Sequence, residues 1–358
     1  MTKETSIFLD LVRFSAALTV VFGHIGGDPK IAGSILWQFS SLANVAVIIF
    51  FVLSGYVVDY ATQRRETDGV SFTSARATRI LSVAVPALAL TALLDSIGSA
   101  VNPVLYAHYH SLSWDRLIAS VTFLNEAWGV DLTPGSNLPY WSLGFEVPFY
   151  ALYGVAIFAS GARRIILLVV ACLVFGPRII VYFPMWLFGV AAIRVTGKLP
   201  IRKGIGWLLL LSSAFACLLG LTMVFFFGYG TLASGAIPEH SPDQIANDYI
   251  IAGLFTAIII GFSAVSSSFA WLCRFESPIR WLAGATFSLY LFHYPILMFM
   301  ASVAPWPHDT WIYLVALLSG SIGGSFLLAE LTERRKSFWR RLTLVHRLQA
   351  TQSRVLSK

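Results

Sequence analysis

The chain alternates between long apolar stretches and shorter segments that carry most of its Arg and Lys residues. About 20 consecutive apolar residues suffice for an α-helix to cross a bilayer. Ten stretches approach this length, at roughly residues 6–25, 36–59, 79–99, 140–160, 164–178, 179–195, 205–228, 248–270, 283–303 and 310–331. Only Gly176, Pro177 and Arg178 separate the fifth from the sixth. The pattern predicts an all-α, polytopic membrane helix bundle of about ten transmembrane helices.

Composition supports this class of protein. The 358 residues are 57% hydrophobic and 12% charged, and the mean hydropathy is +0.73. Soluble domains average about 25% charged residues, so a soluble protein is excluded. The three cysteines (Cys172, Cys217 and Cys273) lie in or beside apolar runs and suggest no disulfide framework. The first apolar run carries charges and no cleavage site, so we expect it to be a helix of the mature protein.

The distribution of basic residues predicts the orientation. With a cytoplasmic N-terminus and ten spans, all 25 Lys and Arg residues except Lys30, Arg116 and Arg178 lie in cytoplasmic segments or at helix ends. Basic residues favour the cytoplasmic side, so we expect both termini there, in a cell membrane and most simply a bacterial inner membrane. The net charge of +7 then reflects basic loops and not nucleic-acid binding. We expect a transmembrane domain over residues 1–331 and a basic cytoplasmic tail over 332–358 that is drawn to anionic membrane lipid.

Two outer connections are longer than a simple turn requires, at about residues 100–139 and 229–247. Long loops are often functional, so we expect them to help choose a substrate. Within the first, Trp114 to Leu124 has the pattern of a short helix lying on the membrane. His108 and His110 could suggest a metal, but they lack further ligands at a fixed spacing, so we expect no metal site.

The first apolar stretch contains Asp10, Arg13 and His24, which a simple membrane anchor would not need. At about 100° per residue, the three side chains fall within roughly 60° of one another on one helical stripe. Charges inside a bilayer cost free energy and usually face a protein interior or an aqueous cavity. His24 could be a hydrogen-bonded or wet histidine at a helix end. The shared stripe favours a general base that takes a proton from a hydroxyl.

Arg76 and Arg79 lie near the predicted start of the third span, three residues apart and therefore on one face of a helical turn. Paired guanidinium groups at a helix N-terminus suit phosphate binding. Topology alone also predicts arginines at a cytoplasmic helix end, so the spacing does not decide between these readings.

Two further groups combine polar side chains with an apolar span. Ser142 and Glu146 are expected one helical turn apart on one face of span four. Glu146 could pair with an arginine of another helix, act as an acid, or orient an imidazole. His293 lies in the middle of span nine, where a buried hydrogen-bonded histidine is the simplest interpretation.

Taken in order, these segments resemble acyltransferase family 3 membrane proteins, which include O-antigen, exopolysaccharide and nodulation-factor acetylases. The motifs are FLDLVRFSAALTVVFGH, FFVLSGY, the Arg76-x-x-Arg79 pair, YWSLGFEVPFY and SLYLFHYPI. The resemblance covers nearly the whole chain. It implies a ten-helix bundle that moves an acyl group, usually acetyl from cytoplasmic acetyl-CoA, to a hydroxyl of a glycan or glycolipid.

The resemblance also implies roles for individual residues. The arginine and histidine of the family's first helix correspond to Arg13 and His24, and its Ser-Leu-x-x-Glu motif corresponds to Ser142, Leu143 and Glu146. We therefore expect Arg13, His24 and Glu146 to be catalytic, with Glu146 as partner of the His24 base near the acceptor. The family's Arg-x-x-Arg pair implies that Arg76 and Arg79 handle the acyl-CoA donor. We take Ser142, Tyr150 and His293 as candidate substrate-binding residues.

Two other classes of protein stay open. A transporter of a lipid-linked glycan or small anion would line its path with the same charges and would need no acyl-CoA. A non-catalytic partner of polysaccharide-assembly proteins would tolerate polar replacements of Arg13, His24 and Glu146. The cost of charges inside the membrane argues against the latter. Nothing in the sequence identifies the acceptor.

Overall fold

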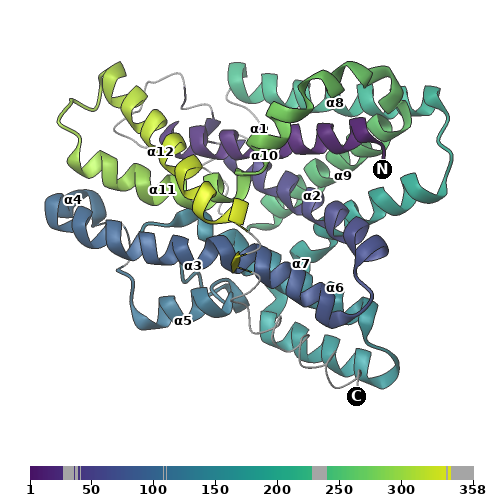
Figure 1. The fold of residues 1–358 in the computed structure, drawn as a ribbon, viewed down its shortest axis with the longest axis horizontal. Helices are drawn as coiled ribbons and strands as arrows, with labels where there is room; N and C mark the ends of the chain where they lie inside the picture. Colours follow the sequence, from purple (N-terminus) through teal and green to yellow (C-terminus); the bar gives the residue numbers. More distant parts are fainter. Residues whose placement is uncertain are drawn as a thin grey trace. The chain divides into compact units, whose positions relative to one another are not determined.

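The apolar stretches form α-helices in the computed structural model of the protein (Figure 1). The structure describes residues 1–26, 36, 39–40, 42–107, 109, 111–227, 240–335 and 338–339. Nine helices of this described part are long and apolar enough to cross a membrane. The same residues contain no strand. The predicted all-helical, multi-pass fold is confirmed, whereas the sidedness of the termini and the division at residue 331 stay predictions.

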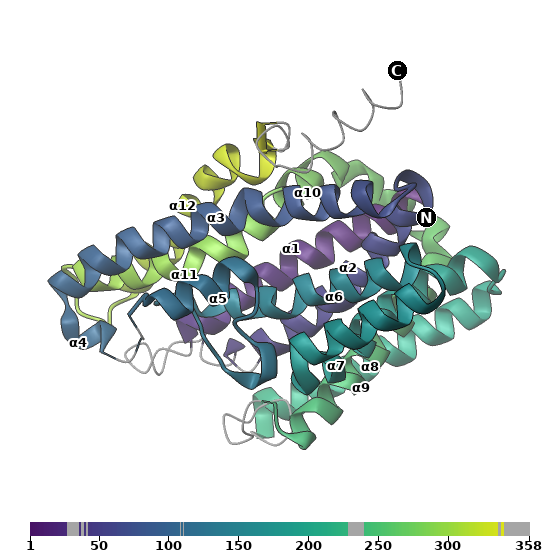
Figure 2. The same cartoon turned by 90° about the horizontal axis from the view of Figure 1, so that it is seen from below.

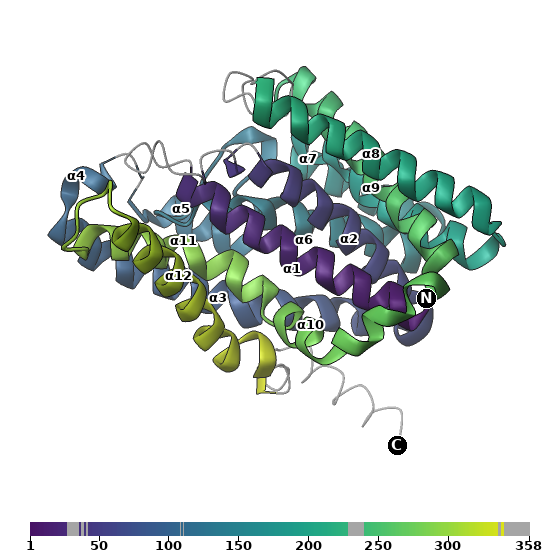
Figure 3. The same ribbon diagram turned by 90° about the horizontal axis from the view of Figure 1, so that it is seen from above.

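The chain forms two compact units, and the first contains residues 1–61 and 182–286. Its elements are α1 (Lys3–Gly26), α2 (Leu42–Arg65), the second part of α7 (Gly161–Lys198), α8 (Lys203–Phe227), α9 (Pro242–Val265), the 3₁₀ helix η5 (Ser266–Phe275) and α10 (Glu276–Ala283). Helix α8 packs along α9 (Figure 2). Helix α1 packs against η5 and α10 (Figure 3), around a core of Ile7, Phe262, Leu272 and Ile279.

The second unit contains residues 62–181 and 287–358. Its elements are α3 (Gly69–Val101), α4 (Pro103–Tyr106), α5 (Trp114–Thr122), the 3₁₀ helices η3 (Ala127–Gly129) and η4 (Leu138–Ser142), α6 (Leu143–Phe158), the first part of α7, α11 (Thr286–Val303), α12 (Trp311–Leu331) and η6 (Glu333–Arg335). Helix α5 confirms the short helix expected in the outer connection at about residues 100–139. Its position on the membrane stays a prediction. Most of the basic tail lies outside the described residues.

Helix α3 begins ten residues before the apolar run that predicted it. The Asp68 carboxylate accepts hydrogen bonds from the backbone N–H groups of Ser71 and Val70, at 2.8 and 2.9 Å, and the Ser71 hydroxyl closes a capping box. These bonds, that of Ser71 first, hold the pKa of Asp68 below its usual range. The cap allows a polar first segment to be helical. The prediction that Arg76 and Arg79 lie at the helix N-terminus is therefore wrong, because Arg76 follows two full turns.

Helix α7 contains both of the predicted short spans. Its backbone is not helical at Gly176, where φ is 79°. The indole of Trp128 fills the break: a Cβ atom at residue 176 would lie 2.8–2.9 Å from Trp128, whose Nε1 donates to the Leu173 carbonyl oxygen at 2.9 Å. Beside it, Arg178 pairs at 2.9 Å with Glu126, which is only 2% exposed. Span predictions five and six are thus two helical segments joined at Gly176.

Glycines allow close helix packing in the first unit. A Cβ atom at Gly55 would collide with the carbonyl oxygen of Trp186 on α7. A Cβ atom at Gly189 would collide with the Val52 carbonyl oxygen and lie 2.6 Å from the Tyr56 nitrogen on α2. The two backbones therefore meet directly, which only glycine permits at these positions.

Candidate active site

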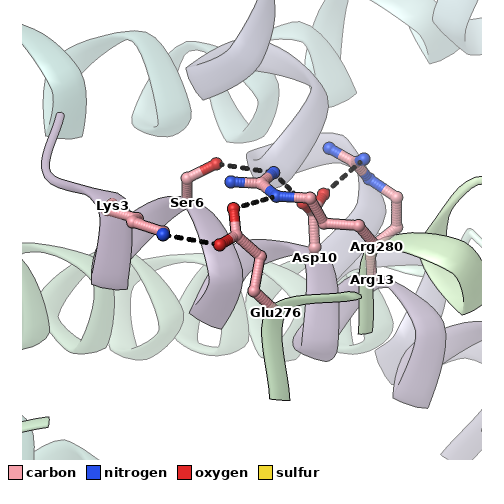
Figure 4. A network of polar contacts seen from close by, with 6 residues as sticks. All are labelled: Lys3, Ser6, Asp10, Arg13, Glu276 and Arg280. Atoms are coloured by element: carbon pink, nitrogen blue, oxygen red, sulfur yellow. Dashed lines mark hydrogen bonds and ion pairs between the residues drawn. The ribbon is translucent and has the colours of Figure 1, made fainter. Parts of the chain in front are cut away.

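The charged residues of α1 form an ion-pair network with α10 (Figure 4). Asp10 accepts hydrogen bonds from two guanidinium groups, that of Arg13 at 3.2 Å and that of Arg280 at 3.0 Å. Asp10 and Arg13 were predicted to share one helical stripe, and their contact agrees with that geometry. The two arginines compensate the Asp10 charge, so the network also explains how α1 can carry a carboxylate.

Sequence analysis missed the α10 side of this network. Glu276 accepts from Arg280 Nε at 3.0 Å and pairs with Lys3 at 2.6 Å (Figure 4). The available signal was the spacing of Glu276 and Arg280, which are four residues apart as in a helical ion pair. These residues lie between the predicted spans 248–270 and 283–303. The network joins the beginning of α1 to α10 and holds Arg13 at a set position along α1.

We expect Asp10→Asn to lower the free energy of unfolding by about 1–2 kcal/mol, because it removes the acceptor that the partly buried Arg13 shares with the more exposed Arg280. Thermal or chemical unfolding in detergent would measure the change. Lys3→Gln is the control, since the Lys3 side chain is 56% exposed and loss of an exposed pair costs less than about 1 kcal/mol. Equal stability of Asp10→Asn and wild type would show that the network does not hold α1 and α10 together.

His24 lies half-buried in the last turn of α1. Its neighbour Gly23 faces the region before α2, where a Cβ atom would lie 2.7 Å from the Phe39 carbonyl oxygen and 2.9 Å from Ala43 Cβ. This close backbone approach positions the imidazole at the end of the first unit where α2 begins. The structure does not test a catalytic role for His24.

A buried carboxylate at the same end was not identified from the sequence. Asp248 of α9 is 1% exposed and accepts hydrogen bonds from Asn44 Nδ2 at 2.9 Å and from the Tyr182 hydroxyl at 3.1 Å. His240 Nδ1 lies 3.2 Å from the same hydroxyl. Asn44 follows Ala43, so this polar group lies beside the His24 end of α1. The only sequence signal for Asp248 is that a carboxylate stands at the start of an apolar run.

In the second unit, Tyr150 connects Glu146 to Arg76. The Tyr150 hydroxyl donates to the Glu146 carboxylate, one helical turn away on α6. The guanidinium carbon of Arg76 on α3 lies 6.0 Å from the centre of the Tyr150 ring. The charge of Arg79 also acts on Tyr150. Arg76 on α3 and Glu146 on α6 thus contact the same tyrosine.

Ser142 does not share an α-helix with Glu146 as predicted. It ends the 3₁₀ helix η4, where its hydroxyl donates to the Pro139 carbonyl oxygen at 3.2 Å. It is nevertheless close to the same group, because the Tyr290 hydroxyl of α11 interacts with both Ser142 and Glu146. Tyr290 was missed, although it lies in the SLYLFHYPI motif.

Arg76 is not an open surface cation. It is 8% exposed and pairs through Nη2 with Glu66, and its guanidinium carbon lies 5.4 Å from the centre of the Phe72 ring. Its Nε is buried and has no hydrogen-bond partner among the described residues. Arg79 is half-buried and so less enclosed than Arg76. Of the two, Arg79 is better placed to meet a ligand that approaches from solvent.

His293 is fully buried in α11, and its Nδ1 donates to the Leu289 carbonyl oxygen at 2.9 Å. This agrees with the interpretation as a buried hydrogen-bonded histidine, and substrate binding by His293 stays a prediction. His24 and Glu146 belong to different units, so their partnership also stays a prediction. The described residues contain no group of three or more His, Cys, Asp or Glu that could hold a metal. His108 and His110 lie outside those residues.

Comparison with known proteins points to one family. A family model described as an acyltransferase domain matches residues 6–330. An O-acetyl transferase of Shigella phage Sf6 is 32% identical over 171 residues, which are 45% of this chain and 49% of the phage protein. Acyltransferase MdmB of Streptomyces mycarofaciens is 30% identical over 149 residues, which are 40% of this chain and 36% of that protein. The chain thus spans half or less of each relative. No solved structure gives a significant match.

Proposed function

Because the chain belongs to the acyltransferase family whose domain model matches nearly its whole length, we propose that it is an integral-membrane O-acyltransferase. The family resemblance noted in the sequence motifs is thereby confirmed. We propose that the acyl group is acetyl, that acetyl-CoA is the donor, and that the acceptor is a hydroxyl of an envelope or exported carbohydrate or glycolipid. The names of the two relatives, an O-acetyl transferase and an acyltransferase, support the reaction class.

One observation carries the assignment of residues to this reaction. The Tyr150 side chain joins Glu146 by a hydrogen bond and Arg76 by a cation–π contact, inside helices long enough to span a membrane. Carboxylates and arginines in such helices are expensive and usually functional. A site for an anionic donor is therefore adjacent to a carboxylate that can take part in proton transfer.

In the proposed reaction, His24 accepts the proton of the acceptor hydroxyl as its oxygen attacks the thioester carbonyl carbon. The carbon–sulfur bond then breaks, and the proton passes to the departing CoA sulfur. The products are the O-acyl ester and free CoA, so atoms and charge balance. Arg76 and Arg79 attract the phosphates of the donor. Arg13 lies on the same polar stripe of α1 as His24. The residues that bind substrate in this scheme are Ser142, Tyr150 and His293.

The proposed setting is a bacterial inner membrane, with the donor supplied from the cytoplasm. Membrane lipid and the carbohydrate acceptor are the expected partners, and polysaccharide-assembly proteins could deliver or remove the acceptor chain. Nucleic acid is not a partner in this scheme.

The test uses the purified full chain in nanodiscs with radiolabelled acetyl-CoA, and follows binding, release of CoA and label on the protein. We expect Arg79→Gln to raise the KM for acetyl-CoA by roughly ten- to hundredfold, the cost of one charge-assisted hydrogen bond. Arg76→Lys should act in the same direction while keeping the charge beside Glu66.

Arg202→Gln is the matched control, because Arg202 is exposed just before α8 and its side chain makes no hydrogen bond or ion pair with the described residues. We expect it to behave as wild type. Folded protein that neither binds acetyl-CoA nor releases CoA would contradict the proposal. Movement of an unmodified glycan across the membrane without acyl-CoA would instead support a transporter.

A further inference from the structure

A groove of about 680 Å³ runs along the surface of the second unit, with α3, α6 and the start of α7 as its walls. Most of its lining is apolar, including Phe72, Ile80, Val147, Ala151 and Phe158. We call this the α3–α6 groove. It involves none of the residues of the first unit.

The two ends of the α3–α6 groove differ. At one end the first residue of α3, the last residue of α6 and the first turn of α7 meet, since a Cβ atom at Gly69 would lie 3.5 Å from Phe158 Cβ and Arg163 also lines the groove. Because three spanning helices begin or end here, this end lies at the membrane–water interface. Leu81 of α3 and Val147 of α6, each about three turns from this end along its helix, line the groove farther in. The distance from Gly69 to Leu81 along α3 is about 18 Å at 1.5 Å per residue.

An apolar groove of this length in membrane-spanning helices has no water to fill it. Val70, Ala151 and Leu167 line it and are also exposed on the surface of the described helices, so hydrocarbon chains can enter from the side. An extended acyl chain of about 14 carbons matches the available length and makes apolar contacts along both walls.

The charged residues of the groove indicate which headgroup the bound acyl chain carries. Arg163 is exposed at the interfacial end and its side chain makes no hydrogen bond or ion pair with the described residues, so its positive charge is uncompensated. The charge of Arg76 is compensated by Glu66. Arg76 Nε, however, is buried, faces no acceptor among the described residues, and belongs to a side chain that lines the groove. A buried N–H without an acceptor is costly, so a ligand oxygen is expected there.

We propose that the α3–α6 groove binds one acyl chain of an anionic phospholipid, with the lipid phosphate at Arg163 and an ester carbonyl oxygen at Arg76 Nε. Basic pockets between spanning helices are suited to such headgroups. The pantetheine part of an acyl-CoA fits less well. It has two amide groups, whereas the groove offers one unsatisfied hydrogen-bond donor, Arg76 Nε. This site goes beyond the proposed acyl transfer, and it makes the lipid a bound component of the second unit. It shares Arg76 with the proposed donor site, so the donor phosphates rest on Arg79, which does not line the groove, while the lipid is bound.

Native mass spectrometry of the full-length protein tests the proposal, with phosphatidylglycerol and phosphatidylcholine of identical chains as probes. We expect wild type to retain phosphatidylglycerol about fivefold better, a preference worth roughly one basic residue near the surface. Arg163→Gln should abolish this preference, and Arg202→Gln, which changes an exposed cation at another helix start, should keep it.

A second pair of variants tests the groove itself. Ala151→Trp should fill the α3–α6 groove and lower retention of phosphatidylglycerol at least fivefold. Ile157→Trp places the same side chain on α6 at a position that is 39% exposed but does not line the groove, and should retain the lipid. Equal retention in both variants would overturn the site. So would displacement of the lipid by saturating acetyl-CoA, which would assign the groove to the donor. Acyl transfer is a separate readout and the proposed donor site keeps Arg79 outside the groove, so either result leaves the proposed function standing.

Discussion

Replacement of His24 by alanine is expected to slow acyl transfer by a factor of about 10² to 10⁴, the usual contribution of a positioned general base. His24 is the histidine on the charged stripe of α1, and the neighbouring close approach at Gly23 holds it in place. Without an acceptor for the hydroxyl proton, the attacking oxygen stays a poor nucleophile. Binding of acetyl-CoA should change little, so the loss belongs in kcat.

The rate of acetyl transfer to a carbohydrate acceptor would be compared with that of His308→Ala. His308 is exposed and its ring lies 4.7 Å from the ring of Tyr313, so its removal should leave the rate unchanged. A folded and inserted His24→Ala protein that transfers acetyl at the normal rate would rule out His24 as the base. A His24→Ala rate as low as the rate of wild type measured without acceptor would agree with the proposal.

The second large effect concerns stability. Gly189→Ala should lower the free energy of unfolding by at least about 2 kcal/mol, because the added Cβ meets backbone atoms of Val52 and Tyr56 that cannot move without separating α2 from α7. Unfolding in detergent, followed by circular dichroism, would measure it.

Gly253→Ala is the matched control in a spanning helix, since no heavy atom lies within 4 Å of a Cβ atom there. The higher helix propensity of alanine should make this variant as stable as wild type or more so, by up to about 1 kcal/mol. Equal destabilisation by both substitutions would show that the contact of α2 with α7 does not contribute to stability.

The predicted site was brought together only in part. The spacing of Asp10 and Arg13 was enough to place them on one face, because helix periodicity is a local property. The partner Arg280 could not be predicted, since it is 270 residues away in sequence and lies in a segment whose helix is too short to stand out by hydropathy. The prediction that Arg76 lies at the N-terminus of its helix was wrong for a related reason. A hydropathy window marks where a helix is apolar and does not detect the polar, capped turns that precede it.

The apolar periods of the sequence were sufficient to determine that this is an all-helical membrane protein, where its spans lie and which of their residues are out of place in lipid. Its motifs together were specific enough to indicate the acyltransferase family. The tertiary structure alone decided that Tyr150 connects Glu146 to Arg76, that Asp248 is buried beside Asn44, and that α3, α6 and α7 enclose a groove. Hydropathy depends on each residue and its near neighbours, whereas these contacts depend on which helix faces pack together, and no local pattern specifies that choice.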